Sequence, residues 1–529
     1  MGAGKIPAIV VLLLSFSIFH GSVQAQYSGG TGSPEDPYLI STLADMNQIG
    51  QNYTDWDKCF KLTADINLSA YTGTQFGCIG TDNTHAFSGV FDGNGHTISG
   101  FTYTAENSYY IGVFGFISDA GRVENISLVD VNVIGLSCVG GLVGYNNGTI
   151  SNCNSTGAVT GVDNSGYIGG LVGYSGGSIS NCYSTGTVTG GNYSYYLGGL
   201  VGVSDGSISN CYSTSSVTGG DNSYCFGGLV GYSGGSISNC YSTGNVAGGD
   251  YSHYLGGLAG QSNGSISNCY STGAVTGEDY SEYLGGLAGQ SNGNISDCNS
   301  TGTVTGGDYS YYLGGLAGQS NGNISNCYST GTVTGGDYSH YLGGLAGQSN
   351  GNISNCYSTG NVTGGDNSNS LGGLVGYNSN LFSDSNISNC YSTGMVSGTS
   401  NVGGLVGYRA NGTISLCYFL TTSGPNDGNG TPLTDAQMKQ QSNFVGWDFN
   451  DVWHICETTN YPKLIWQIVP GDFVCPDGVD FADYSFFAER WLNTDCASNN
   501  NCDGADMDTT GTVDIADLAI MCDYWLKGL

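Results

Sequence analysis

The chain has 529 residues, 92 of them glycine, and only 9% are charged. Its 41 acidic and 9 basic residues give a formal charge of −32, and no Lys or Arg stands between Arg122 and Arg409. Nucleic-acid binding depends on Lys and Arg contacts to phosphates, so this composition excludes that class of partner. Proline is scarce and not periodic, which excludes collagen. The 39% of hydrophobic residues are enough to form a core.

The N-terminus predicts a secretory signal peptide over residues 1–25. Lys5 supplies a positive start, an apolar run extends from Ile6 to Phe19, and Val23-Gln24-Ala25 fits a small-residue cleavage site. The apolar run is too short for a membrane span, and the sequence has no other long apolar stretch. The mature chain is therefore expected to be secreted or on the cell surface, with no transmembrane segment after signal removal.

Residues 26–135 are predicted to form an N-terminal cap and the first, atypical coils of a solenoid. The segment Leu43–Asn52 has helical apolar spacing. A helix here could cover the open end of the solenoid and shield an exposed strand edge. Strand-like runs then begin at Phe60, Gly89, Ile111 and Val123.

A repeat of fixed length occupies residues 136–418. The first glycine of a Gly-Gly-Leu signature recurs every 29 residues from Gly140 to Gly372, and another copy follows at Gly403. A fixed period in this range indicates stacked coils. We therefore predict an all-β fold, a parallel β-helix with 29-residue coils, right-handed by analogy with most β-helices. A small α-helical calcium-loop module is predicted at its C-terminus.

Each coil is expected to contain three short strands, carrying Gly-Gly-Leu, Ile-Ser-Asn-Cys and Thr-Val-Thr. The isoleucine ladder starting at Ile150 and the valine ladder starting at Val159 are predicted to point inward. Cys153 follows Ile150 by three residues, which breaks strand alternation if both side chains are buried. A corner at Asn152 in the left-handed conformation resolves this, and it favours a β-helix over hairpins.

The motif Gly286-Leu287-Ala288-Gly289 resembles the GLUG repeat, and the resemblance extends over about residues 112–418. Such repeats occur in secreted and surface-attached bacterial proteins, some of them described as adhesins or linked to immunoglobulin-A peptidases. The resemblance thus implies a surface role and leaves the biochemical activity open.

Three polar or aromatic ladders each allow two interpretations. The cysteines can be stacked buried thiols, or disulfides or metal ligands. The acidic ladder can consist of solvated turn residues or bind calcium between coils. The tyrosines can stabilise the sheet by stacking or form an exposed strip that binds sugars. The cysteine ladder is Cys153, Cys182, Cys211, Cys240, Cys269, Cys298, Cys327, Cys356, Cys390 and Cys417. The acidic ladder is Asp163, Asn192, Asp221, Asp250, Asp279, Asp308, Asp337 and Asp366. The tyrosine file beside the cysteines is Tyr183, Tyr212, Tyr241, Tyr270, Tyr328 and Tyr357.

Residues 419–468 are predicted to be a C-terminal cap. A short helix is expected within Leu433–Gln441. Trp447, Trp453 and Trp466 are interpreted as packing aromatics, since the repeats contain no tryptophan.

Residues 469–529 contain two candidate calcium loops. The second has Asp506, Asp508, Thr510, Asp514 and Asp517 at loop positions 1, 3, 5, 9 and 12, with Gly511 at position 6 for the sharp turn. Thr512 completes this candidate ligand set. The first loop offers Asp472, Asp480 and Asp483, but Val474 and Pro476 stand where ligands belong. Helices are expected over Tyr484–Leu492 and Leu518–Leu526.

This paired loop-helix arrangement resembles a type I dockerin. The resemblance implies calcium as cofactor and a cohesin-like or cell-surface partner. Cys475, Cys496, Cys502 and Cys522 could form two disulfides in this module, with their pairing left open.

The sequence gives little support for catalysis. A glycosidase needs two carboxylates in distinct environments, whereas these coils are nearly identical. His85 and His96 lie near Asp92 in sequence and could contribute to a separate site. We predict a secreted, non-catalytic adhesin or carbohydrate-binding solenoid anchored through its calcium-dependent tail. The alternatives are a polysaccharide lyase or glycosidase of a dockerin-containing assembly, or a structural cell-envelope spacer.

Overall fold

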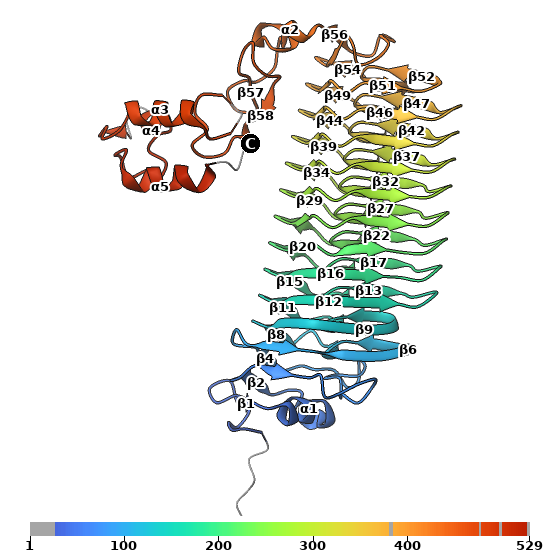
Figure 1. The fold of residues 1–529 in the computed structure, drawn as a ribbon, viewed down its shortest axis with the longest axis vertical. Coiled ribbons are helices and arrows are strands. Elements are labelled where there is room, and N and C mark those ends of the chain that lie inside the picture. Colours follow the sequence, from blue (N-terminus) through green and yellow to red (C-terminus); the bar gives the residue numbers. More distant parts are fainter. Residues whose placement is uncertain (1–26, 380–384, 476–477, 497–499, 526–529) are drawn as a thin grey trace, which may run out of the picture.

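The computed structural model describes residues 27–379, 385–475, 478–496 and 500–525 (Figure 1). The predicted signal peptide lies outside the described residues, as does Pro476 of the first calcium loop. The helices within the described residues are all too short or too polar to cross a lipid bilayer.

The chain forms a parallel β-solenoid, which confirms the predicted fold class. One sheet of 14 strands runs from β1 (Tyr38–Ile40) to β54 (Ile414–Ser415), and one of 11 strands runs from β7 (Phe114–Ile117) to β53 (Val406–Arg409). The remaining strands of the solenoid pair along a third side. Figure 1 shows the coils stacked in sequence order from the N-terminal end. A typical coil contains β32 (Tyr283–Gly285), β33 (Ala288–Ser291), β34 (Ile295–Ser296), β35 (Asn299–Ser300) and β36 (Val304–Gly306).

Identical residues pair between successive coils. Ile295 lies opposite Ile324 and Leu284 opposite Leu313 in parallel register. Burying such a side chain contributes about 1.5–3 kcal/mol, and every coil repeats the contribution. Within the typical coil the fully buried apolar side chains are those of Leu284, Leu287, Ala288, Ile295, Cys298 and Val304.

The corner between the isoleucine and cysteine strands has the predicted conformation. Asn152 and Asn181 have φ of 53°, in the left-handed region, and Asp297 takes the same position with φ of 54°. The corner lets Ile295 and Cys298 both point inward, although three residues separate them. The sequence argument for a β-helix is therefore confirmed at this point.

The Gly-Gly pair allows two backbone segments to approach closely. A Cβ atom on Gly285 would lie 1.8 Å from the carbonyl oxygen of Ala288, and one on Gly286 would lie 2.2 Å from that of Gly315. Because both obstacles are backbone atoms, no rotamer change would relieve the clash. The signature is therefore required by packing, which explains its presence in every coil.

The cysteine ladder is a column of buried thiols and forms no disulfide. The Cys240 thiol donates a hydrogen bond to the carbonyl oxygen of Ser238 (3.1 Å) and accepts one from the Cys211 amide (3.4 Å). Burial raises the pKa of the Cys182 thiol above its ordinary value. The interpretation as stacked apolar thiols is confirmed, and inter-coil disulfides are absent among the described residues.

Helices lie at the two ends of the chain. α1 (Leu43–Gln51) begins at a capping box formed by Thr42 and Asp45, as the predicted helix requires. α2 (Asp435–Met438) falls within the segment predicted as helical, and β57 (Trp453–His454) pairs antiparallel with β58 (Lys463–Leu464). The described C-terminal helices are α3 (Phe481–Glu489), α4 (Asn500–Asp503) and α5 (Ile515–Tyr524).

The helices α3 and α5 begin three residues earlier than the sequence predicted. Asp480 and Asp514 are their N-caps, and each forms a capping box with the aspartate three residues later. The carboxylates expected only as metal ligands therefore also define where the helices start.

Replacing Gly314 by alanine should destabilise the solenoid by about 3 kcal/mol or more, because its Cβ would lie 1.8 Å from the Ala317 carbonyl oxygen. Thr303→Ala is the control, since Ala274 already occupies the equivalent slot. Urea denaturation followed by circular dichroism measures both. Equal midpoints for the two variants would refute the close-approach argument.

The ladder thiols should resist alkylation in the folded protein, because each side chain is buried out of reach of the reagent. Iodoacetamide under native conditions should modify Cys522, which is exposed, while ladder peptides become labelled only in denaturant. Peptide mapping by mass spectrometry gives the labelled fraction at each position. Native labelling of Cys240 or Cys269 would show that the coils open.

Candidate functional site

A column of tyrosines follows the cysteine ladder on the outer surface of the solenoid. The rings of Tyr183 and Tyr212 are 4.7 Å apart with an interplanar angle of 4°, and those of Tyr212 and Tyr241 are 4.8 Å apart at 1°. Tyr270 continues the stack, and Asn299 interrupts it. We call this column the tyrosine file. The predicted stacking is confirmed, and it has a consequence for binding: each inner ring has its faces covered by neighbouring rings and presents its edge and hydroxyl.

The C-terminal cap covers the later part of the tyrosine file. Tyr391 is 2% exposed, and its hydroxyl donates a hydrogen bond to the Pro462 carbonyl oxygen (2.7 Å). The ring of Trp453 lies 6.1 Å from that of Tyr391. Burial raises the pKa of the Tyr391 phenol well above its ordinary value. Figure 1 shows β57 and β58 beside the last coils.

The cap reaches farther back along the solenoid than its sequence position suggests. Trp466 packs against Tyr328, with the ring centroids 5.6 Å apart, and donates a hydrogen bond from Nε1 to the Asn326 carbonyl oxygen (3.1 Å). The sequence predicted packing aromatics but not where they pack. Two features of the sequence could have indicated this contact. The repeats contain no tryptophan, and they carry a file of tyrosines that the cap tryptophans could pack against.

The tyrosine file is therefore divided into two parts. Tyr357, Tyr391 and Tyr418 are buried under the cap. Tyr183 and Tyr241 are half-buried, and Tyr270 is 38% exposed. Partial burial raises the pKa of Tyr241 and Tyr270 above 10.0. Only the earlier coils offer this column to a partner.

A second tyrosine column occupies a corner of the coils. Tyr251, Tyr280, Tyr309 and Tyr338 stack with centroid separations of 4.7–4.9 Å and are 38–49% exposed. Each has φ of 57–59°, in the left-handed region that Asn occupies more readily. Asn222 fills the same slot in another coil. We call these four residues the corner strip.

The acidic ladder is used to join neighbouring coils. The Asp279 carboxylate accepts a hydrogen bond from the backbone N–H of Asp308 (2.9 Å), and Asp308 accepts one from Asp337 (2.8 Å). Thus, where two carboxylates of neighbouring coils lie close together, one of them also accepts a hydrogen bond from the backbone N–H of the other residue. This favours the interpretation as turn residues. The described residues contain a single group of three potential metal ligands with adjacent ligand atoms, and it lies elsewhere.

The histidines do not converge on one site. His96 lies 3.2 Å from the Asp65 carboxylate, and His85 lies 3.4 Å from that of Asp82. Asp92 instead accepts a hydrogen bond from the Asn125 side chain (2.9 Å). The structure therefore does not bring together the residues considered for a separate site near Asp92.

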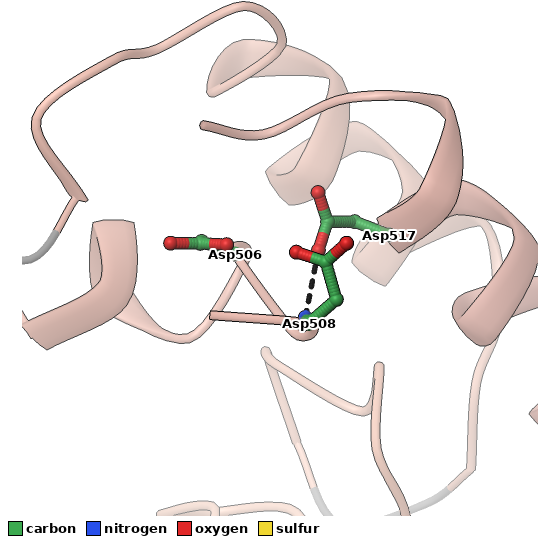
Figure 2. Close-up of side chains that lie close together, drawn as sticks. All are labelled: Asp506, Asp508 and Asp517. Carbon is green, nitrogen blue, oxygen red and sulfur yellow. Dashed lines mark hydrogen bonds between the residues drawn. The ribbon is translucent and has the colours of Figure 1, made fainter. Parts of the chain in front are cut away.

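The second calcium loop brings three carboxylates together. Asp506, Asp508 and Asp517 each place one carboxylate oxygen within 4.8 Å of those of the other two. Figure 2 shows the three side chains close together. Asp517 accepts hydrogen bonds from the backbone N–H groups of Asp508 (3.0 Å) and Asp514 (2.9 Å). These bonds fix the loop around the carboxylates, and oxygen donors of this kind suit Ca²⁺.

The other candidates in this loop lie around the three carboxylates. The Thr510 hydroxyl donates to Asp508 (2.8 Å), and this bond lowers the pKa of the Asp508 carboxyl. Asp514 accepts from the Ala516 amide as the cap of α5 (2.8 Å), and Thr512 pairs with Thr494 in a β-bridge. Asp514 and Thr512 therefore have structural contacts in addition to any role toward a metal.

The first loop has the same backbone hydrogen bonds as the second but a different set of side chains. Asp483 accepts hydrogen bonds from the backbone N–H groups of Phe473 (2.6 Å) and Val474 (2.9 Å), and Asp480 caps α3. Asp472 accepts from the Gly478 amide (3.2 Å). Val474 stands where the second loop has Asp508: both donate a backbone N–H to the last aspartate of their loop, but Val474 supplies no carboxylate. The first loop forms no cluster of three carboxylates within the described residues.

The disulfides differ in part from the expected set. Cys496 pairs with Cys502 inside the module, but Cys475 pairs with Cys456 of the cap, and Cys522 is a free thiol. The expectation of two disulfides among four module cysteines is wrong in this respect. The Cys456–Cys475 bond links the C-terminal module covalently to the cap.

Comparison with known proteins identifies the repeat. Two relatives match part of the chain: halomucin of Haloquadratum walsbyi is 40% identical over 140 residues, 25% of this chain and 2% of the relative. A protein of Evansella cellulosilytica named as a Gly-rich membrane protein is 38% identical over 153 residues, 27% of this chain and 18% of the relative. The chain therefore spans a small part of each relative.

A solved structure described as an immunoglobulin A1 protease from Bacteroides ovatus is 18% identical, and the match covers 83% of this chain and 96% of that one, with a TM-score of 0.28. This likeness is too distant to support an argument. The matches to the family described as the GLUG motif lie at residues 135–160, 164–189, 193–218, 222–247, 251–276, 280–305, 309–334, 338–363 and 367–397. The central solenoid is therefore built from nine GLUG motif repeats.

Proposed function

We propose that this protein is a non-catalytic solenoid of the cell surface or the secreted fraction, which binds carbohydrate through its repeated outer faces. The observation that carries the proposal is the in-register tyrosine file, half of which lies outside the cap. A repeated surface of this kind suits a repetitive ligand, because each coil can make the same contact. The names of the two relatives, halomucin and a membrane protein, support a surface location.

The C-terminal module serves in this proposal as a calcium-dependent anchor. Its second loop has the carboxylate cluster, and the two helices begin with equivalent sequences, Asp480-Phe481-Ala482-Asp483 and Asp514-Ile515-Ala516-Asp517. Phe481 is 80% exposed and Ile515 is 69% exposed. Large apolar side chains exposed at matching positions are typical of a docking surface for a protein partner such as a cohesin-like module.

Calcium binding should depend on the second loop. We expect the full chain to bind one Ca²⁺ there, and Asp506→Asn to abolish binding by removing a charged ligand from the cluster. Isothermal titration calorimetry measures the stoichiometry and affinity. Asp523→Asn is the matched control, since Asp523 is exposed on α5 outside the loop.

A second binding event that is lost in Asp472→Asn would assign a site to the first loop as well. Unchanged calcium affinity in Asp506→Asn would exclude the second loop as the calcium site.

Carbohydrate binding can be tested on a glycan array with the mature protein, with and without calcium, recording both retained protein and released oligosaccharides. The proposal predicts retention without cleavage, and no effect of calcium on the solenoid's own binding. Released oligosaccharide would overturn the non-catalytic assignment. The absence of both signals would favour a structural spacer of the cell envelope.

A further inference from the structure

The strand that follows each cysteine carries a row of side chains on its outer side. After the tyrosine come Thr, then a variable residue (Ala, Ser, Thr, Asn or Met), and then Thr in all segments except those ending in Ala247 and Ser397. These residues alternate with buried ones such as Val304 (0% exposed). Successive coils align these rows: Thr276 lies opposite Thr305, and Thr305 opposite Thr334. We call this surface the threonine face. Its nine segments are residues 154–160, 183–189, 212–218, 241–247, 270–276, 299–305, 328–334, 357–363 and 391–397.

The threonine face has no charge, although the protein has a formal charge of −32. None of its nine segments contains Asp, Glu, Lys, Arg or His. The acidic ladder lies just beyond it, at positions such as Asp308 and Asp337. A polyanion would be repelled by that ladder and would find no cation on the face, and a polycation would find no carboxylate on it. The electrostatics therefore select an uncharged partner.

The hydroxyl groups of the face are available to a ligand. Thr303, Thr305, Thr332 and Thr334 are exposed, and their hydroxyls make no hydrogen bond with any part of the chain that the structure describes. A threonine hydroxyl both donates and accepts, so it can pair with a ligand hydroxyl in either sense. Its β-branched side chain is stiff at χ1, which lowers the entropy cost of ordering it on binding.

The threonine face adjoins an interface that the chain already uses. The cap covers the tyrosine file at Tyr357, yet Thr363 of the same coil remains exposed. In the earlier coils both the tyrosine edges and the threonine rows are accessible. The combined surface thus offers apolar ring edges beside rows of hydroxyls and methyl groups, repeated at the coil spacing of 4.7–5.0 Å given by the stacked rings.

We propose that the threonine face, bordered by the accessible tyrosine file, docks an ordered, uncharged polysaccharide whose repeating hydroxyls lie along the solenoid axis. This inference rests on the proposed carbohydrate-binding function and assigns it a face and a ligand class. The corner strip, although aromatic and exposed, lies immediately beside the acidic ladder in sequence and is not part of the docking surface.

The test uses the full chain and insoluble cellulose and chitin as uncharged probes, with the bound fraction measured by sedimentation of the polymer. The face variant is Thr160→Ala, Thr189→Ala, Thr218→Ala and Thr276→Ala, which copies Ala247 of the same column and lies in the earlier coils. The control is Tyr251→Asn, Tyr280→Asn, Tyr309→Asn and Tyr338→Asn, which copies Asn222 of the corner position. Both variants use residues that the repeat already accommodates, and circular dichroism checks their folding.

The face variant should bind at least about tenfold more weakly to whichever of the two polymers the natural chain binds, because four hydroxyl contacts are lost, while the control binds as the natural chain does.

Weaker binding in the control with an unchanged face variant would overturn the assignment of the face and leave the carbohydrate-binding function standing. Binding to soluble glycans on the array but to neither polymer would overturn the ligand class alone. Absence of binding to every carbohydrate would overturn both proposals. Self-association that the face variant abolishes, measured by sedimentation velocity, would assign the face to a second copy of the chain instead.

Discussion

The stacking of identical residues at the coil spacing is the constraint on which the rest of this structure depends. A parallel solenoid with a fixed period places every side chain beside its own copy, so each residue type must tolerate a like neighbour at about 4.8 Å. Apolar residues meet this condition by packing, and tyrosines by stacking. Gln261 and Gln290 meet it because an amide can donate to an identical amide (2.8 Å). Aspartates meet it at the corner by accepting a backbone N–H from the next coil, as Asp279 does. Lysine and arginine have no acceptor for such a ladder, which accounts for their absence from the coils between Arg122 and Arg409.

This constraint explains why so much of the fold could be predicted from sequence. The 29-residue period predicts the length of each coil. The three-residue step from Ile150 to Cys153 predicts the corner at Asn152, because strand alternation alone cannot bury both side chains. Local chemistry likewise predicted α1 and the grouping of Asp506, Asp508 and Asp517. The start of α5 was missed because Asp514 was considered as a metal ligand only, while its hydrogen bond to the Ala516 amide also makes it a helix cap. When a residue fits two sequence patterns, sequence analysis assigns it to the stronger pattern and misses the other.

The parts that could not be predicted depend on contacts between segments far apart in the chain. No periodicity relates Trp466 to Tyr328, or Cys456 to Cys475, so neither contact has a signal in the repeat. Both contacts belong to the same arrangement, in which the chain leaves the last coil and turns back along the solenoid side. This arrangement buries the tyrosine side chains of the last coils, which would otherwise form an exposed aromatic patch. It also means that the cap decides how much of the tyrosine file remains accessible.

The proposed function depends on repetition of the coils and not on a single active site. Catalysis needs groups in distinct environments, and stacking of nearly identical coils removes such distinctions, since each coil creates the surroundings of the next. What stacking supplies is repetition: a weak contact made by one coil is made by its neighbours in the same direction and at a fixed spacing. The contacts made by successive coils would then strengthen one another, as those of linked binding sites do. Because the coils are held rigidly, no entropy is lost in ordering a flexible linker. Affinity would consequently follow the number of accessible coils more than the identity of any one residue, and the place where the cap ends becomes as important to binding as the composition of the face.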